Sequence, residues 1–396
     1  MTTYKGIMII LDGLGDRPVA AFDGRTPLEA AQTPVMDRLA ASGLCGLVSP
    51  LTEWVPAETQ TGTGMLFGLA RKDLKRLTRG PVEAAGVGLS LRDGDLALRC
   101  NFATLRPNGT TFDILDRRAG RIAEDTDVLC KVLDGMDLGD GITGRLCPGT
   151  EHRAVLVLSG PPLSDAVTNT DPGAGRKTDG VQPCRERTPG DALAAQTAEA
   201  VNTFVRHSYR RLHDHPVNRR REARGLLPAN GLITRGAGKV AMLRNLVVHL
   251  GLKAALVAGE ETIKGLARLF GFHVIDHPEF TGTRHTDVAA KVTAARHALD
   301  DHDLVFLHVK ATDTYAHDLD PVGKKEMIER IDGALASLLA PDLVIGITGD
   351  HATDSTLGIH TGDPVPACLA APHSRTDAVT AFSEQACMHG GLGHLS

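Results

Sequence analysis

The side chains best suited to chemistry in this 396-residue chain are carboxylates and imidazoles that follow short apolar runs. Six of them have the types and spacing of metal ligands: Asp12, Asp313, His317, Asp350, His351 and His360. Asp313 and His317 are four residues apart, so on a helical turn both would face the same way. Such a ligand set suits two adjacent divalent cations, which activate a nucleophile and bind a transferring phosphoryl group. The leading hypothesis is therefore a two-metal site for phosphoryl transfer.

Such a site needs a nucleophile, and a loop rich in hydroxyl groups offers three candidates. Thr59, Thr61 and Thr63 lie among glycines in the segment 56–64. A threonine hydroxyl is unreactive at neutral pH unless a metal ion or a base lowers its pKa. Threonine beside glycine in a loop is usually only a turn residue, so the chemical interpretation of this loop depends on the metal-ligand set.

Cationic side chains that suit an anionic substrate form a second group. Arg117, Arg118 and Arg121 place three guanidinium groups within one short segment, a pattern suited to two-point binding of carboxylate or phosphate. Arg235, which lies beside glycines, and Lys264 are further candidates. Each of these residues on its own is more often a surface cation than a ligand. We predict that together they bind a small anionic, phosphorylated substrate.

The apolar pattern predicts the elements that position these residues. Buried strands are expected at 6–11, 232–234, 254–258, 273–276, 304–309 and 343–348, and helices at 34–41, 239–250, 262–270, 286–299 and 321–339. Short apolar strands that alternate with helices favour a mostly parallel sheet covered on both faces. Acidic groups at the ends of such strands lie where open α/β sheets bind their ligands.

The middle of the chain has a different character. Strands are predicted at 96–105, 111–115 and 154–158, a long loop at 164–189 and a helix at 191–213. The basic run 218–224 is either a solvated helix face or an anion site. We interpret residues 1–75 and 235–396 as a metal-binding α/β core, and residues 76–234 as an inserted α+β domain that binds the substrate.

Composition narrows the class of protein. Hydrophobic residues make up 42% and charged residues 23% of the chain, which predicts an ordinary packed globule. Aromatic residues are only 4% and the net charge is -5, which argues against nucleic acid and acidic membranes as partners. No apolar stretch approaches the ~20 residues of a membrane span. Seven scattered cysteines without C-x-x-C spacing predict reduced thiols, so the expected location is the cytoplasm, and the oligomeric state stays open.

The motifs resemble, in order and over almost the full length, those of the archaeal-type cofactor-independent phosphoglycerate mutases of the alkaline phosphatase superfamily. The segments that carry the resemblance are Leu11-Asp-Gly-Leu-Gly-Asp, Glu29-Ala-Ala-Gln-Thr-Pro, Arg79-Gly-Pro-Val-Glu-Ala-Ala-Gly, Asp116-Arg-Arg-Ala-Gly-Arg, Glu151-His-Arg, Thr234-Arg-Gly-Ala-Gly, Ile263-Lys-Gly, His308-Val-Lys-Ala-Thr-Asp, Gly349-Asp-His and His360-Thr-Gly-Asp-Pro-Val-Pro. The resemblance implies an enzyme that interconverts 3- and 2-phosphoglycerate on an alkaline-phosphatase-like core with an inserted cap.

The resemblance also implies how the ligands divide. One cation is held by Asp313, His317 and His360. The other is held by Asp12, Asp350, His351 and the nucleophile hydroxyl. Mn²⁺ is usual in such sites, and Mg²⁺, Co²⁺ and Zn²⁺ are possible substitutes.

The chain departs from these mutases at the nucleophile. They typically carry a serine, whereas counting back from Gly68 places Thr59 at that position. The pattern Thr-x-Thr-Gly resembles the phosphopentomutase branch of the superfamily, and Thr63 stands where Asn or His is usual. A specialised relative that acts on a modified phosphoglycerate or phosphonate, a metal-dependent phosphohydrolase and a non-enzymatic binding protein therefore remain alternatives.

Overall fold

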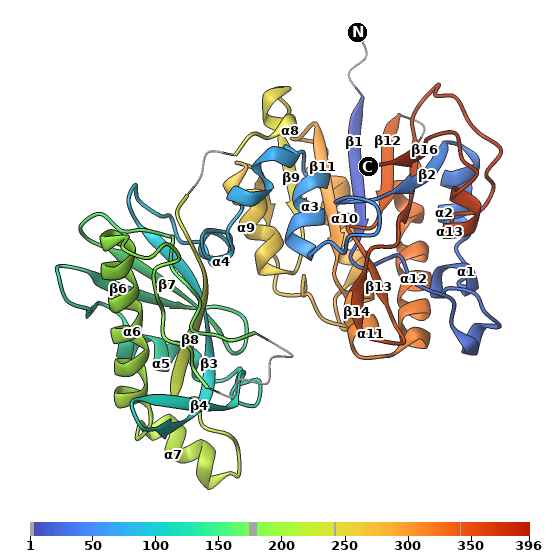
Figure 1. Ribbon diagram of the computed structural model, residues 1–396. Coiled ribbons are helices and arrows are strands. Elements are labelled where there is room, and N and C mark those ends of the chain that lie inside the picture. The colour runs from blue at the N-terminus through green and yellow to red at the C-terminus, as the bar shows by residue number, and fades with distance from the viewer. Residues whose placement is uncertain (1–3, 174–179, 241–242, 341) are drawn as a thin grey trace. The chain divides into compact units, whose positions relative to one another are not determined.

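The computed structural model describes residues 4–173, 180–240, 243–340 and 342–396. The chain forms two compact units (Figure 1). The first unit consists of Met1–Leu74 and Leu243–Ser396, and the second of Lys75–Met242. The first unit is thus built from both ends of the chain, and the second is one continuous segment.

A mostly parallel sheet forms the centre of the first unit, with the strand order β10-β9-β11-β1-β12-β15-β2-β16. Its strands are β1 (Lys5–Leu11), β2 (Leu44–Val48), β9 (Ala254–Val257), β10 (His273–Ile275), β11 (Leu304–Val309), β12 (Leu343–Thr348), β15 (Val365–Ala370) and β16 (Gly393–Leu395). β15 is antiparallel to both of its neighbours, and the other described pairs are parallel. The first strand lies between β11 and β12, so the ends of the chain share one sheet, as predicted.

Helices cover both faces of this sheet. They are α1 (Pro27–Ala30), α2 (Pro34–Ala41), α3 (Thr59–Leu66), α8 (Leu246–His249), α9 (Glu261–Leu269), α10 (Val288–Ala298), α11 (Ala311–His317), α12 (Pro321–Leu335) and α13 (Glu384–Cys387), with 3₁₀ turns at Ala20–Phe22 and Ala336–Leu338. Ile7, Ile9 and Leu11 of β1 pack on one face in a core shared with α2, α10 and α12. On another part of the sheet, Phe306 of β11 packs against Phe67, with ring centroids 4.6 Å apart. The alternating side chains of β1 and β11 thus anchor helices to the sheet that carries the site.

The second unit is an antiparallel α+β fold. Its elements are α4 (Arg79–Gly86), β3 (Leu96–Asn108), β4 (Thr111–Asp116), α5 (Thr126–Leu133), β5 (Met136–Asp137), β6 (Thr143–Pro148), β7 (Arg153–Ser159), α6 (Ala192–Leu212), α7 (Pro216–Ala223) and β8 (Gly231–Gly238), and a 3₁₀ turn at Arg71–Arg76 precedes it. The strand order is β4-β3-β7-β6-β5, and β8 also pairs with β3. α6 begins where Asp191 accepts a hydrogen bond from the N–H of Ala194, a local signal that made this helix predictable.

Several predicted elements are wrong in extent or in partner. The strand expected at 232–234 is longer, Gly231–Gly238, and pairs antiparallel with β3 of the second unit. The predicted boundary at residue 235 therefore cuts through β8. The helix expected at 239–250 is reduced to Leu246–His249, and residues 241–242 lie outside the described residues. The hydroxyl-rich segment 56–64, expected to be a loop, instead contains the first turns of α3.

None of the helices in the described part of the chain has the length and apolar character that crossing a bilayer requires.

Candidate active site

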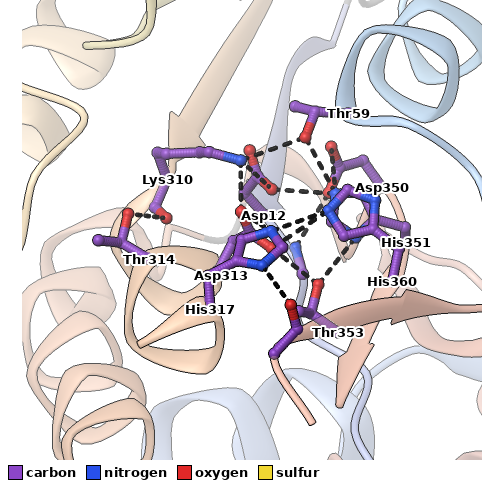
Figure 2. A network of polar contacts seen from close by, with 12 residues as sticks. Asp12, Thr59, Lys310, Asp313, Thr314, His317, Asp350, His351, Thr353 and His360 are labelled. Atoms are coloured by element: carbon purple, nitrogen blue, oxygen red, sulfur yellow. Dashed lines mark hydrogen bonds and ion pairs between the residues drawn. The ribbon is translucent and has the colours of Figure 1, made fainter. Parts of the chain in front are cut away.

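The candidate metal ligands lie at the carboxyl ends of neighbouring strands in the first unit (Figure 2). Asp12 directly follows β1, Asp313 lies on α11 just after β11, and Asp350 follows β12. His351 is the next residue, and His360 lies on β14 (Ile359–Thr361), which pairs with β13 (Ala352–Asp354). Because β11, β1 and β12 run parallel, their carboxyl ends bring residues from both ends of the chain into one cluster.

Each of the three predicted imidazole ligands has its Nδ1 atom within hydrogen-bond distance of an oxygen. His317 Nδ1 is 2.7 Å from the carbonyl of Gly358, and His360 Nδ1 is 2.9 Å from the carbonyl of Ala57. A carbonyl only accepts, so each Nδ1 carries a hydrogen and leaves Nε2 as the free ligand atom. His351 Nδ1 is 3.1 Å from a hydroxyl oxygen in the same way. This is the arrangement of imidazoles that bind a metal ion through Nε2.

The Nε2 atoms point to the carboxylates. His351 Nε2 is 3.2 Å from Asp12 Oδ1, and His360 Nε2 is 3.7 Å from Asp313 Oδ1. His317 Nε2 is 3.4 Å from Asp313 Oδ2. The candidate ligand atoms form two sets, and within each set they lie within 4.8 Å of one another. One set is Asp313, His351 and His360, and the other is Asp12, Asp350 and His351. The structure thus brings all six predicted ligands together, with His351 within reach of both sets.

Thr59 is the first residue of α3, and its hydroxyl faces this cluster (Figure 2). Its Oγ1 atom is 3.1 Å from His351 Nε2 and 3.2 Å from Lys310 Nζ. Thr63, one turn further along α3, donates a hydrogen bond of 2.9 Å from its hydroxyl to Asp350 Oδ2. Of the three threonines of this segment, Thr59 thus contacts an imidazole and an ammonium group of the cluster, and Thr63 binds one of its carboxylates.

The carboxylates give the cluster a strong negative charge, which one ammonium group partly offsets. Lys310 Nζ lies 3.1 Å from Asp12 Oδ1 and 2.5 Å from Asp313 Oδ2. Burial alone would lower the pKa of Lys310, but these two carboxylates raise it above its usual value. Burial would raise the pKa of Asp12, yet Lys310 and the nearby imidazoles hold it well below its usual range. Against the effect of burial, Asp350 and Asp12 raise the pKa of His351 to about 9. These shifts describe an environment that attracts cations.

Sequence reasoning missed three residues of this cluster and the supporting role of a fourth, Thr63. Lys310 lies in the motif His308-Val-Lys-Ala-Thr-Asp, but no role was predicted for it. His308 is fully buried, with Nε2 3.2 Å from Asp12 Oδ2. Thr353 donates a 2.7 Å hydrogen bond from its hydroxyl to Asp313 Oδ1, and Thr63 supports Asp350. The available signal was position, because each of them lies within a few residues of a predicted ligand or of the nucleophile.

The predicted arginines lie in the second unit. The guanidinium group of Arg117 binds the carboxylate of Asp171 at 2.6–2.9 Å. Arg118 and Arg121 are exposed. Burial and several nearby arginines, first Arg153 and then Arg118, lower the pKa of His152 to about 3. Arg117 is thus occupied by an internal ion pair, whereas Arg118 and Arg121 are exposed.

A buried part of this cationic group was not predicted. Arg99 lies opposite Arg235 in the pairing of β3 with β8. Arg99 is 4% exposed, and its Nη1 is 3.2 Å from Glu83 Oε1, which Arg79 Nε also contacts at 3.3 Å. The Nε atoms of Arg99 and Arg235 have no hydrogen-bond partner among the described residues. This surplus of guanidinium groups suits a carboxylate or phosphate ligand. Arg235 was a predicted candidate, but strand pairing brings it beside Arg99, whose role no local pattern reveals.

Lys264 has a different environment from the one predicted. It lies on α9, where its Nζ is 2.5 Å from Asp276 Oδ1. The contact that the structure shows for its ammonium group is this ion pair, not one with the ligand cluster. A role of Lys264 in substrate binding therefore stays a prediction.

A mostly parallel sheet that collects carboxylates, imidazoles and a threonine hydroxyl at the carboxyl ends of its strands has the architecture of an α/β enzyme. A family model described as 2,3-bisphosphoglycerate-independent phosphoglycerate mutase matches residues 40–218. The mutase of that name from Methanopyrus kandleri is 42% identical, and the alignment covers 99% of this chain and 93% of the relative. The mutase 1 of Methanothermobacter thermautotrophicus is 41% identical, with 98% and 94% covered.

Solved structures agree with these relatives. The PH0037 protein from Pyrococcus horikoshii has a TM-score of 0.83 at 35% identity, and 100% of this chain and 94% of that chain are covered. The cofactor-independent phosphoglycerate mutase from Thermoplasma acidophilum has a TM-score of 0.70 at 34% identity, with 99% and 96% covered. The chain belongs to the 2,3-bisphosphoglycerate-independent phosphoglycerate mutases, a family of enzymes. The predicted family is confirmed, and the alternative of a non-enzymatic binding protein is set aside.

Proposed function

We propose that this enzyme interconverts 3-phosphoglycerate and 2-phosphoglycerate through a phosphothreonine intermediate on Thr59, at a site with two divalent cations. The family assignment supports the substrate. The observation that carries the rest is the position of the Thr59 hydroxyl, 3.1 Å from His351 Nε2 and 3.2 Å from Lys310 Nζ, beside the ligand cluster.

The donor atoms fit two cations. One would be held by Asp313, His317 and His360, and the other by Asp12, Asp350, His351 and Thr59, with His351 within reach of both. Asp12 is fully buried, and its two carboxylate oxygens face His308, His351 and Lys310, a concentration of polar groups that suits a bound cation. Bound cations would lower the pKa of the threonine hydroxyl and neutralise charge on the phosphoryl oxygens. Mn²⁺ is the proposed metal, with Mg²⁺, Co²⁺ and Zn²⁺ as substitutes.

The protein's own groups then perform two balanced transfers. Thr59 Oγ1 attacks phosphorus in line, so a bond to Oγ1 forms as the bond to the glycerate oxygen breaks. The threonine hydroxyl releases a proton, and the departing oxygen takes one up. Lys310, 3.2 Å from Oγ1, stabilises the negative charge of the transferring group. Attack by the other hydroxyl of glycerate on phosphothreonine reverses the transfer and yields the isomer.

A mutase must also hold glycerate between the two transfers, because water would otherwise hydrolyse the intermediate. We assign that task to arginines of the second unit, with Arg118 and Arg121 as the first candidates. The unpaired Nε atoms of Arg99 and Arg235 support a carboxylate ligand in this unit.

A coupled assay tests the proposal. The Mn²⁺-loaded protein is given 3-phosphoglycerate, enolase reports 2-phosphoglycerate, and free phosphate is measured in parallel. We expect isomerisation with little release of phosphate, and phosphothreonine at Thr59 in protein quenched during turnover and analysed by mass spectrometry. Stoichiometric phosphate without 2-phosphoglycerate would overturn the mutase proposal, and phosphate on another residue would overturn the assignment of the nucleophile.

A second candidate function is a relative that acts on a modified phosphoglycerate or phosphonate, or a metal-dependent phosphohydrolase. The observation that favours it is Thr63, whose hydroxyl binds Asp350 Oδ2 where these mutases usually carry Asn or His. The same two assays discriminate, because a hydrolase releases phosphate and a specialised mutase leaves 3-phosphoglycerate unchanged.

A further inference from the structure

Thr353 is a fully buried residue of β13 that has no part in the reaction proposed above. Its hydroxyl lies between ligands assigned to different cations (Figure 2). Thr353 Oγ1 is 2.7 Å from Asp313 Oδ1 and 3.1 Å from His351 Nδ1. A single side chain thus joins the ligand that follows β11 to the ligand that follows β12.

The direction of these two hydrogen bonds is fixed by chemistry. An ionised carboxylate only accepts, so the one hydroxyl hydrogen of Thr353 is donated to Asp313. The hydroxyl oxygen must then accept from His351 Nδ1–H. In the neutral imidazole that metal binding requires, Nε2 is then the atom left to bind a cation, and it faces Asp12 and Thr59. The hydroxyl therefore sets both the orientation of Asp313 and the tautomer of His351.

The fold holds this hydroxyl in place from three sides. The N–H of Thr353 donates to the carbonyl of Gly15 at 2.9 Å, and its own carbonyl accepts from the buried ammonium of Lys324 at 3.0 Å. Gly13 has a φ of +63°, and a Cβ there would lie 2.6 Å from Thr353 Oγ1 and 2.8 Å from Asp313 Oδ1. The absence of a side chain at Gly13 is thus a condition for the contact between the hydroxyl and the carboxylate.

His351 differs in this respect from the other two imidazoles of the cluster. His317 and His360 bind backbone carbonyls through Nδ1, and a side-chain substitution does not remove those carbonyls. His351 binds a side-chain hydroxyl instead. Its orientation therefore depends on one residue that can be replaced.

We propose that Thr353 is a positioning residue that couples the two cation subsites, because its hydroxyl orients Asp313 for one cation and His351 for the other. The inference rests on the two-cation site proposed above. It predicts that removal of the hydroxyl weakens both cations together, rather than the nearer one alone. Partners of metal ligands of this kind typically contribute about 10- to 100-fold to metal affinity.

The test is a titration of the full-length, metal-free protein with Mn²⁺. Calorimetry measures the binding affinities during the titration, and electron paramagnetic resonance reports magnetic coupling between two bound Mn²⁺ ions. Thr353→Val keeps the shape of the side chain and removes the hydroxyl. We expect both stepwise affinities to fall by about 10- to 100-fold and the coupled signal to weaken. Thr353→Ser keeps the hydroxyl and should restore both.

Thr348→Val is the matched control, since Thr348 is also a buried threonine and its hydroxyl bonds to the backbone carbonyl of Pro366. Its Mn²⁺ affinities should equal those of the wild type. If Thr353→Val does not fold, as judged by circular dichroism, Thr353→Ala removes the same hydroxyl without the crowding of a second methyl group.

The outcomes separate the two proposals. Fewer than two Mn²⁺ ions in the wild type would contradict the two-cation site itself. Two ions in the wild type, with unchanged affinities or only one weakened in a folded Thr353 variant, would overturn the coupling role of Thr353. A serine variant as weak as the valine variant would also overturn it, because packing rather than the hydroxyl would then be responsible.

Discussion

The Thr59 hydroxyl is a poor nucleophile in water, and its surroundings decide whether it reacts. His351 Nε2 and Lys310 Nζ lie at 3.1 and 3.2 Å from it. We predict that Thr59→Ala lowers kcat by at least about a thousandfold, because it removes the covalent intermediate. The coupled assay measures this loss, and circular dichroism and Mn²⁺ titration should show that the fold and most metal affinity persist.

Thr61→Ala is the control for that substitution, since Thr61 lies on the same helix two residues further along. It should keep activity within a few-fold of the wild type. The reverse pattern, with Thr61→Ala inactive and Thr59→Ala active, would show that the nucleophile is misassigned.

Lys310 supplies the one ammonium group among the carboxylates of the described cluster. Substitution of Lys310 tests whether this group acts in the reaction. We predict that Lys310→Met lowers kcat by about 10²- to 10³-fold, because the ammonium stabilises charge on the transferring group. KM should change much less, and Mn²⁺ affinity should not fall, since the lost group is itself a cation. A variant with near-normal kcat would show that Lys310 only compensates the charge of Asp12 and Asp313.

At the scale of residues, a role could be predicted where it follows from the type of a single side chain and its place in the sequence. The six predicted metal ligands are acids and imidazoles, and the structure places them close together, although a bound metal stays a proposal. Thr353 and Arg99 escaped prediction because their roles depend on partners distant in sequence, Asp313 and Arg235. The ion pair of Lys264 with Asp276 was missed for the same reason. Pairwise geometry, not residue type, determines these roles.

At the scale of elements, strong local patterns succeeded. The strands predicted at 304–309 and 343–348 are β11 and β12 without change, because continuous apolar runs mark strands buried on both faces. β8 was assigned to the wrong sheet, since an apolar run does not identify its partner strand. α3 was read as a loop because its glycines and threonines are weak helix formers, and tertiary contacts overrode that propensity.

The junction of α1 with α13 gives a prediction about pH. Glu384 Oε2 accepts a 2.9 Å hydrogen bond from Thr26 Oγ1, while the buried Oε1 has no partner among the described residues. Burial raises the pKa of Glu384 from 4.5 to about 7. Between these values the folded protein keeps a proton that the unfolded chain has lost, so the free energy of unfolding decreases as pH rises.

Glu384→Gln should therefore remove part of this pH dependence. We expect the free energy of unfolding of the variant, relative to the wild type, to rise by up to about 3 kcal/mol between pH 4.5 and 7.5. Urea unfolding across this range measures the difference. Parallel curves for the two proteins would contradict the prediction.

At the scale of the whole molecule, the two units predict separable defects. Substitutions in the arginine group of the second unit should impair retention of glycerate without removing the nucleophile. We predict that Arg118→Ala and Arg121→Ala raise the ratio of free phosphate to 2-phosphoglycerate, because water replaces the lost acceptor. The two assays run in parallel give this ratio. An equal fall in both products, with their ratio unchanged, would remove these residues from the carboxylate site.

The place of β1 between β11 and β12 has a consequence for synthesis on the ribosome. At about 5–20 residues per second, the nascent chain completes Lys75–Met242 well before the partners of β1 emerge. The second unit can therefore fold while Lys5–Leu11 waits, for roughly tens of seconds, as an unpaired apolar strand. Such a segment is prone to aggregation when exposed. Lys5–Leu11 is thus a stretch of the growing polypeptide that benefits from a chaperone until β11 and β12 have been made.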